Sequence, residues 1–241
     1  RSWRMLRHLP DSLGRLKTLK HLDLRNQELR ELPETIGKLR SLETLDLRGN
    51  NLTVLPDSIG GLTSLKRLNL GRNRITHLPE SISNLTALIF LNLSRNALRR
   101  LPESFGRLTA LRTLDLRNNG LMALPNSFGN LRSLRCLSLK NNPYVKIPPS
   151  FWNLRSFIYL DLKHDQLLQI PSGMGNLRNL QVLNLGHNDV RDLPRSMRNL
   201  CSLRILSLEG NRLSSLPEWF KDLQSLEKLS IRWNELGGLP D

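Results

Sequence analysis

Few residues of the chain have the types and spacing that catalysis requires. His164 directly precedes Asp165, and a histidine beside a carboxylate is a pair that can transfer protons in an enzyme. No serine or cysteine follows at a place from which it could act as the nucleophile. The two cysteines, Cys136 and Cys201, have no histidine near them in the sequence. We therefore interpret Asp165 as an irregularity in the surrounding pattern rather than as a catalytic residue.

Binding motifs for nucleotides and metals are missing from the sequence as well. It contains no G-x-x-x-x-G-K-[ST] loop, no G-x-G-x-x-G turn, no H-E-x-x-H pair and no EF-hand calcium loop. We expect no enzyme activity, no cofactor and no metal site within this chain. Its chemistry must then lie in noncovalent contacts, which depend on how the fold arrays its side chains.

The elements that position these side chains follow from a strict repeat of 23 residues. One large apolar residue recurs at this interval without insertion or deletion, at Leu19, Leu42, Leu65, Leu88, Leu111, Leu134, Phe157, Leu180, Leu203 and Leu226. Each unit follows the pattern L-x-x-L-x-L-x-x-N-x-L-x-x-L-P-x-x-I-G-x-L-x-x. A fixed period of this length indicates stacked supersecondary units that share one continuous core.

Each part of the unit has a physical interpretation. The L-x-L core alternates inward and outward side chains, as a strand does. The L-P step fixes φ and begins a return segment, for which about 23 residues leave room only for a short helix or 3₁₀ turn. An asparagine at the ninth position can donate and accept hydrogen bonds at the turn after the strand. This predicts an asparagine ladder of Asn50, Asn73, Asn96, Asn119, Asn142, Asn188, Asn211 and Asn234, interrupted at Gln27 and Asp165.

The predicted fold is an α/β solenoid, shaped like a horseshoe, with a parallel concave β-sheet and short helical or 3₁₀ segments on the convex side. Residues 1–18 form a partial N-terminal repeat, and residues 19–241 form ten repeats of which the last is truncated. We expect a single continuous domain, because no segment between the repeats has the composition of a linker. No run approaches the ~20 apolar residues of a membrane-spanning helix. The first ten residues show no apolar stretch typical of a signal peptide.

These units resemble the 23-residue leucine-rich repeats of plant intracellular Ras-group proteins and their animal scaffold relatives. They are also similar to the repeat domains of type III effectors of plant-pathogenic bacteria. The L-P-x-x-I/F-G-x-L-x-x-L form, as at residues 101–111, carries the resemblance over essentially the whole chain. It implies recognition of a protein partner on the concave sheet or its edges, with no catalytic residue in the repeats themselves.

Reading the strand positions as columns gives a candidate binding surface. Third-position side chains include a run of apolar residues, and the seventh position supplies neighbouring cations. Contiguous exposed apolar surface marks binding sites, and aromatic residues often anchor them. The candidate partner-binding residues are Phe90, Arg117, Cys136, Lys140, Tyr159, Lys163, Val182 and Ile205. The alternative is that strand propensity alone placed these β-branched and aromatic residues there.

Charged residues two apart on the strands suggest local ion pairs on the same face. The candidate pairs are Asp23 with Arg25, Asp46 with Arg48, Asp115 with Arg117 and Asp161 with Lys163. Such exposed pairs contribute little to stability.

A possible secondary patch lies on the convex side. Arg132, Arg155 and Arg178 stack in successive units, and Trp152 stands where other units have glycine. This patch could bind a partner or a phosphate-bearing surface. The arginines could equally be a solvated row, and Trp152 could fill a groove over its neighbours.

The formal charge of +15, from 36 Lys+Arg and 21 Asp+Glu, favours acidic partners. Electrostatic binding to nucleic acid or an anionic membrane is therefore the alternative to protein recognition. A further alternative is a substrate-recognition domain of an enzyme, such as a ubiquitin ligase, whose catalytic part lies outside this chain. Two isolated cysteines indicate a reducing compartment, so we expect an intracellular protein of signalling or virulence, and an effector of this kind would be secreted into a host cell.

Overall fold

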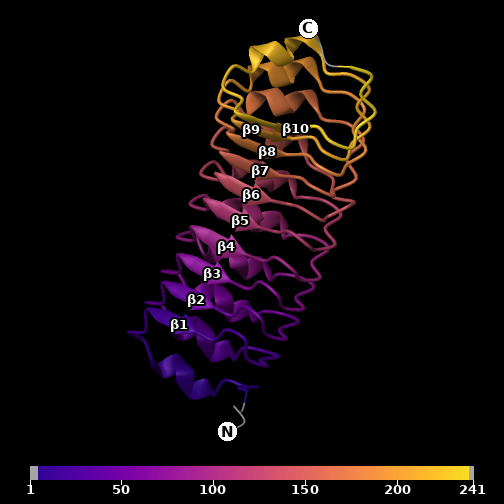
Figure 1. Cartoon of the computed structure of the whole chain (residues 1–241). Coiled ribbons are helices and arrows are strands. Elements are labelled where there is room, and N and C mark those ends of the chain that lie inside the picture. The colour runs from indigo at the N-terminus through magenta and orange to yellow at the C-terminus, as the bar shows by residue number, and fades with distance from the viewer. Residues whose placement is uncertain (1–4, 239–241) are drawn as a thin grey trace.

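The computed structural model describes residues 5–238 and consists of one parallel sheet with ten strands in chain order. Consecutive coils stack into an elongated solenoid whose two ends lie far apart (Figure 1). The strands are β1 (His21–Asp23), β2 (Thr44–Asp46), β3 (Arg67–Asn69), β4 (Phe90–Asn92), β5 (Thr113–Asp115), β6 (Cys136–Ser138), β7 (Tyr159–Asp161), β8 (Val182–Asn184), β9 (Ile205–Ser207) and β10 (Lys228–Ser230). The predicted solenoid of parallel strands is confirmed.

Strand register follows the 23-residue period throughout. Tyr159 pairs with Val182, for example, and Val182 pairs with Ile205. The central leucine of β2 to β9 is buried in the core, whereas the residues on either side of it face the opposite side of the sheet. We call this outer side the sheet face. Its side chains therefore form the straight columns that the sequence predicts.

Ten short 3₁₀ helices in the described residues return the chain to the next strand. They are η1 (Asp11–Arg15), η2 (Glu34–Lys38), η3 (Asp57–Gly61), η4 (Glu80–Asn84), η5 (Glu103–Arg107), η6 (Asn126–Asn130), η7 (Pro149–Asn153), η8 (Ser172–Asn176), η9 (Arg195–Asn199) and η10 (Glu218–Asp222). Each begins directly after a proline in extended conformation. Proline suits this place because its φ is fixed, and because the helix does not need the N–H that proline lacks. The helices stack in a column of their own beside the strands (Figure 1).

The asparagine ladder satisfies backbone groups between strand and helix. The Nδ2 atom of Asn50 donates to the carbonyl oxygens of Leu24 at 2.8 Å and of Leu47 at 2.9 Å. Its Oδ1 accepts the backbone N–H of Leu29 at 3.1 Å. The other ladder asparagines repeat this geometry one coil further on. The carbonyl groups of the turn lose contact with water when the coils stack, and the asparagine amides supply the hydrogen bonds in its place. This avoids a cost of ~1–3 kcal/mol for each group that would otherwise be unsatisfied.

Asp165 interrupts this ladder without forming a catalytic pair. Its side chain is buried, and Oδ1 accepts the backbone N–H of Asn142 at 2.8 Å. Among the described residues, Oδ2 has no hydrogen-bond partner. Burial raises the pKa of this carboxyl group to about 8, partly opposed by the hydrogen bond from Asn142. His164, the preceding residue, is exposed and stacks instead on the ring of His187, with centroids 4.6 Å apart.

The core contains a run of aromatic side chains, and Trp152 belongs to it. Phe105 stacks on Phe128, which stacks on Phe151, and the indole of Trp152 meets Phe151 edge-on at 4.9 Å. Trp152 is only 7% exposed. Its predicted place in an exposed convex patch is therefore wrong, because the indole fills a space inside the coil stack.

Candidate functional site

Four neighbouring strands place an apolar strip on the sheet face. Cys136 pairs with Tyr159, which pairs with Val182, which pairs with Ile205, so their side chains are adjacent from β6 to β9. We call these four residues the apolar strip. Ile205 is 36% exposed and the other three are half-buried. The structure therefore brings together four of the sequence-predicted residues as a continuous surface.

Phe90 stands apart from this strip. It lies on β4, and Thr113 of β5 separates it from Cys136. The guanidinium of Arg67 lies 4.3 Å from the centre of its ring, in a cation–π contact that covers part of the ring.

Tyr159 is fixed on its own strand. Its hydroxyl oxygen lies 3.4 Å from Oδ2 of the buried Asp161, to which it donates a weak hydrogen bond. Burial and the negative charge of Asp161 raise the pKa of the Tyr159 hydroxyl to about 12. Tyr159 is therefore a neutral, half-buried side chain whose hydroxyl group is hydrogen-bonded, which suits an aromatic anchor with little conformational entropy to lose.

The three predicted cations beside the strip differ in how they are paired. Arg117 forms an ion pair with Asp115 at 3.1 Å, as the spacing predicts. Lys163 instead contacts Glu209, two coils away, at 2.8 Å. The predicted Asp161–Lys163 ion pair is wrong, because the Asp161 carboxylate accepts the backbone N–H of Lys163. Lys140 has no ion pair within the described residues.

The other two predicted local pairs also have different outcomes. Arg25 contacts Asp23 at 2.7 Å, so this pair is confirmed. The Asp46 carboxylate accepts the backbone N–H of Arg48 at 3.0 Å, whereas the charged group in contact with it is Arg25 of the preceding coil, at 3.9 Å. The guanidinium of Arg48 is left unpaired in the part of the chain that the structure describes.

A polar hollow of about 310 Å³ lies at the edge of the sheet where the strands end. We call it the basic hollow, and it is lined by Arg48, Gly71, Arg72, Asn92, Ser94, Arg95, Arg117, Asn118, Lys140 and Asn141. Arg117 and Lys140 are predicted site residues, but Arg72 and Arg95 are not. They occupy the eighth position of the repeat, directly before the ladder asparagine, where the backbone has a positive φ. A column read at that position would have revealed them.

The predicted arginine row is exposed and follows the 3₁₀ helices directly. Arg132, Arg155 and Arg178 follow the ends of η6, η7 and η8, in the turns that lead to the next strands. They therefore lie at the opposite edge of the sheet from the basic hollow. Since Trp152 is buried, these residues do not form one patch, and a role for the arginines in binding stays a prediction.

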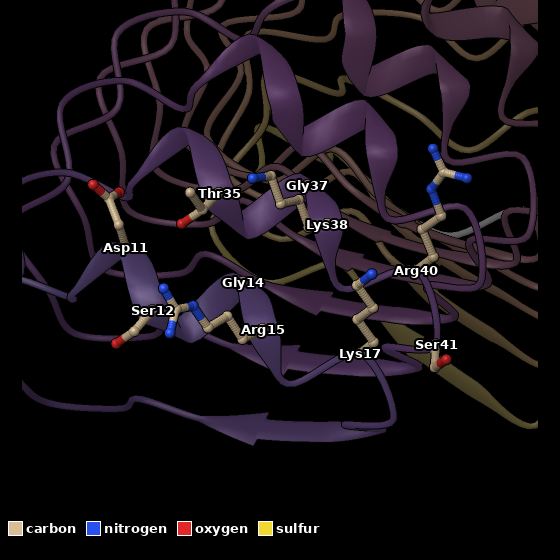
Figure 2. A pocket seen from close by; sticks show the side chains of 10 residues that line it. All are labelled: Asp11, Ser12, Gly14, Arg15, Lys17, Thr35, Gly37, Lys38, Arg40 and Ser41. Atoms are coloured by element: carbon tan, nitrogen blue, oxygen red, sulfur yellow. The ribbon is translucent and has the colours of Figure 1, made fainter.

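A larger hollow lies at the N-terminal end, and its polar side chains do not converge on one point (Figure 2). It measures about 930 Å³, and its lining comes from η1, η2 and the turns after them. Figure 2 shows its charged side chains, including Arg15, Lys17 and Arg40, spread along the surface rather than directed at one point. A ligand site needs polar groups that converge, so we assign no site here.

Two features were not found in the described part of the chain: a metal-binding cluster and a membrane-spanning helix. This part contains no group of three or more histidine, cysteine, aspartate or glutamate side chains placed to hold a metal ion. Within the same residues, none of the helices has the length and apolar character needed to cross a membrane.

Comparison with known proteins shows which family the repeat matches. The family described as "Leucine-rich repeat region" matches residues 6–92, 80–158 and 149–236. A leucine-rich-repeat protein of Leptospira interrogans is 32% identical with a TM-score of 0.78, over 97% of this chain and 65% of that one. A chain of the Toll–Spatzle complex of Drosophila is 28% identical with a TM-score of 0.86, over 97% of this chain and 32% of that one.

A third solved structure is a plant peptide hormone receptor, RGFR1, in complex with RGF2. It is 26% identical with a TM-score of 0.65, over 95% of this chain and 46% of the receptor structure. This chain thus spans less than two thirds of the length of each of the three proteins. No curated protein sequence matches it significantly. From the three family matches, which together cover nearly all of its residues, the chain belongs to the leucine-rich-repeat family.

Proposed function

We propose that this chain recognises a protein partner through its sheet face, with the apolar strip as the anchor of the interface. Leucine-rich repeats present an extended surface to which partners bind, and two of the similar structures are complexes by title. The observation that supports the proposal best is the adjacency of Tyr159, Val182 and Ile205 on three paired strands. A half-buried aromatic ring with aliphatic neighbours is typical of the residues that contribute most to binding.

The charges around the strip define the partner's chemistry. Lys140 follows β6 in the same coil as Cys136, one outward position beyond Ser138, and it is unpaired among the described residues. Arg117 is bound to Asp115 and Lys163 to Glu209, so neither is fully available. We infer a partner that presents apolar side chains to β7–β9 and an acidic group towards β5 and β6. Electrostatic complementarity of this kind sets orientation and association rate more than affinity.

We further propose that the chain acts inside a cell, as the recognition domain of a larger signalling protein or of a bacterial effector. Cys136 and Cys201 are free thiols, which suits a reducing compartment. The resemblance of the repeats to plant intracellular proteins and to effectors supports the same proposal. The repeat domain then supplies binding, and any enzymatic activity belongs to other parts of the protein.

The experiment captures partners from cell lysate at about 0.15 M salt with nuclease present, identifies them by mass spectrometry and measures binding to the purified candidate. Tyr159→Ala/Ile205→Ala should weaken that binding at least ~tenfold, because each removed side chain is part of the apolar contact. His21→Ala/Lys228→Ala, at the same strand position in β1 and β10, is the matched control. Equal affinity of both variants would place the interface elsewhere, and capture lost on nuclease treatment would favour nucleic acid.

A further inference from the structure

We infer that the basic hollow is a binding site for a compact anion that carries two or more phosphate groups. The proposal does not depend on the protein partner proposed above. It rests on a cluster of cations that the fold leaves without counter-charges, on hydrogen-bond donors between them, and on a gap in the side chains that leaves room for a ligand.

The basic hollow has more positive charge than the chain neutralises. Arg48, Arg72, Arg95 and Lys140 line the hollow, and none of them forms an ion pair within the described residues. Arg117, the fifth cation, is paired with Asp115. No carboxylate is among the lining residues. Neighbouring coils lie about 4.8 Å apart, so Arg72 and Arg95, which belong to adjacent coils, repel each other well inside the screening length of ~8 Å at physiological salt.

The same edge of the molecule is neutralised only a few coils further on. In the coils of β7 to β10 the corresponding positions hold two cations, Lys163 and Arg232, and the imidazole of His187, and Glu209 lies among them. Its carboxylate is 2.8 Å from Lys163, 3.4 Å from His187 and 4.0 Å from Arg232. The chain therefore supplies an internal counter-ion for one set of cations at this edge and none for the set in the hollow. An external anion would complete the second set as Glu209 completes the first.

The basic hollow also has room for a ligand. The seventh-position side chains along this edge are long at Arg48, Arg117 and Lys140 but small at Gly71 and Ser94. This interval forms the hollow, and a Cβ on Gly71 would lie 3.0 Å from Nδ2 of Asn92. At ~30 Å³ for each water in the liquid, 310 Å³ corresponds to about ten waters. That is room for a small polyatomic ligand over Gly71 and Ser94, with arginines on both sides.

The lining chemistry suits phosphate. Asn92 and Asn118 add amide groups, whereas Nδ2 of Asn141 already donates to Oδ1 of Asn118 at 2.6 Å, and guanidinium groups bind phosphate in a two-pronged geometry. A single phosphate carries ~−2 at most, which cannot neutralise four cations spread over several coils. A carboxylate carries half of that. Two or more linked phosphates carry enough negative charge to pair with several of these cations at once.

The test is isothermal titration of tripolyphosphate into the purified chain at about 0.15 M salt, with inorganic phosphate and sulfate as comparison ligands. We expect one tripolyphosphate bound for each chain, at least ~tenfold more tightly than inorganic phosphate. Arg72→Asn/Arg95→Asn should weaken binding by ~tenfold or more. Asparagine is the natural residue at this repeat position at Asn118 and Asn141, so these changes suit the backbone there.

The matched control is Arg132→Gln/Arg155→Gln, which removes the same charge at the opposite edge of the sheet and should leave the affinity unchanged. Equal losses in the two double variants would mean that net charge alone attracts the anion, and would overturn the proposal. Inorganic phosphate bound as tightly as tripolyphosphate would overturn the requirement for linked phosphates. A single-stranded oligonucleotide that binds when tripolyphosphate does not would replace the small anion with nucleic acid.

Discussion

The indole of Trp152 lies directly over Gly173 of the next coil. A Cβ built on Gly173 would be 2.6 Å from Cγ of Trp152, closer than any real contact of this kind. In the neighbouring coils the position of Trp152 holds the small residue and the position of Gly173 holds the larger one, as with Gly129 and Ser150. The large residue and the small residue have thus changed places between adjacent coils, and each substitution makes room for the other.

This relationship predicts coupled effects on stability. Gly173→Ser should lower the free energy of unfolding by ~1–3 kcal/mol, because the added side chain overpacks against the indole. Trp152→Gly should lower it by ~3 kcal/mol or more through the loss of a buried aromatic residue. The double variant Trp152→Gly/Gly173→Ser restores the regular pattern and should be more stable than the sum of the two losses by at least ~1 kcal/mol. Urea unfolding of the four proteins measures this coupling, and simple additivity would show that the two sites do not compensate.

Asp165 should make the protein less stable as the pH rises through neutrality. Burial raises its pKa to about 8, above the unfolded value near 3.9, so the folded state holds the proton more tightly. The stabilisation is complete below pH ~4 and is lost as the pH approaches 8, by at most ~1.4 kcal/mol for each unit. Asp165→Asn should remove this loss, because a neutral amide can donate to the carbonyl groups of Leu139 and Leu162 as the regular ladder does.

Thermal unfolding of both proteins between pH 5 and pH 8 measures the effect. Asp165→Asn should be the more stable protein at pH 8, with a flatter profile over the whole range. Asp192→Asn, which changes an exposed carboxylate in the next coil, is the matched control. A profile for Asp165→Asn that falls as steeply as that of the wild type would assign the pH dependence to other groups.

Arg95→Asn should stabilise the chain when no anion is bound. Arg95 has a φ of 56°, a conformation that costs an ordinary L-residue ~1 kcal/mol and that asparagine tolerates better. The substitution also removes repulsion from Arg72 in the adjacent coil. We expect a gain of ~0.5–1 kcal/mol in the free energy of unfolding at low salt, and a smaller gain in 1 M NaCl, where screening removes the repulsive part. Arg99→Asn, an exposed residue outside the positive-φ positions, should give no such gain.

Much of the fold could be predicted because spacing alone determines it. A 23-residue period fixes the strand register, so the adjacency of Tyr159, Val182 and Ile205 follows from their places in the unit. The proline before each return segment and the ladder asparagines likewise act locally. The short helices after the prolines and the hydrogen bonds of the asparagine ladder are both present as predicted. Even the burial of Trp152 had a signal in the sequence, since Gly173 interrupts the column of small hydroxyl residues at the matching place in the next coil.

Side-chain pairing could not be predicted in the same way. The i, i+2 spacing predicted the Asp115–Arg117 pair correctly, but Lys163 contacts Glu209, which lies two coils away. When a long side chain can reach several acceptors, the surrounding charges determine which one it contacts, and distance along the sequence does not. The basic hollow needed two columns to be read together, because Arg72 and Arg95 come from a turn position where asparagine or glycine is the usual expectation.

Glu209 gives the last prediction, since it is the residue that distinguishes its end of the sheet edge from the basic hollow. Hydrogen bonding to Lys163, assisted by the charges of Lys163 and His187, holds its pKa below the usual value for glutamate. A lowered pKa stabilises the fold above the unfolded pKa of ~4.3, and this contribution is lost as the pH falls below that value. Glu209→Gln should therefore cost about 1 kcal/mol at pH 7 and very little at pH 3.

The same substitution should leave the cations Lys163 and Arg232 without their counter-charge. If missing counter-charge is what makes the basic hollow attractive to phosphate, Glu209→Gln should gain a weak second tripolyphosphate site, detected as a change from one to two bound anions in the titration. Glu227→Gln, which removes an equal charge from an exposed pair with Arg204, should not. A stoichiometry of one for Glu209→Gln would show that unpaired cations are insufficient, and that the gap at Gly71 and Ser94 is needed as well.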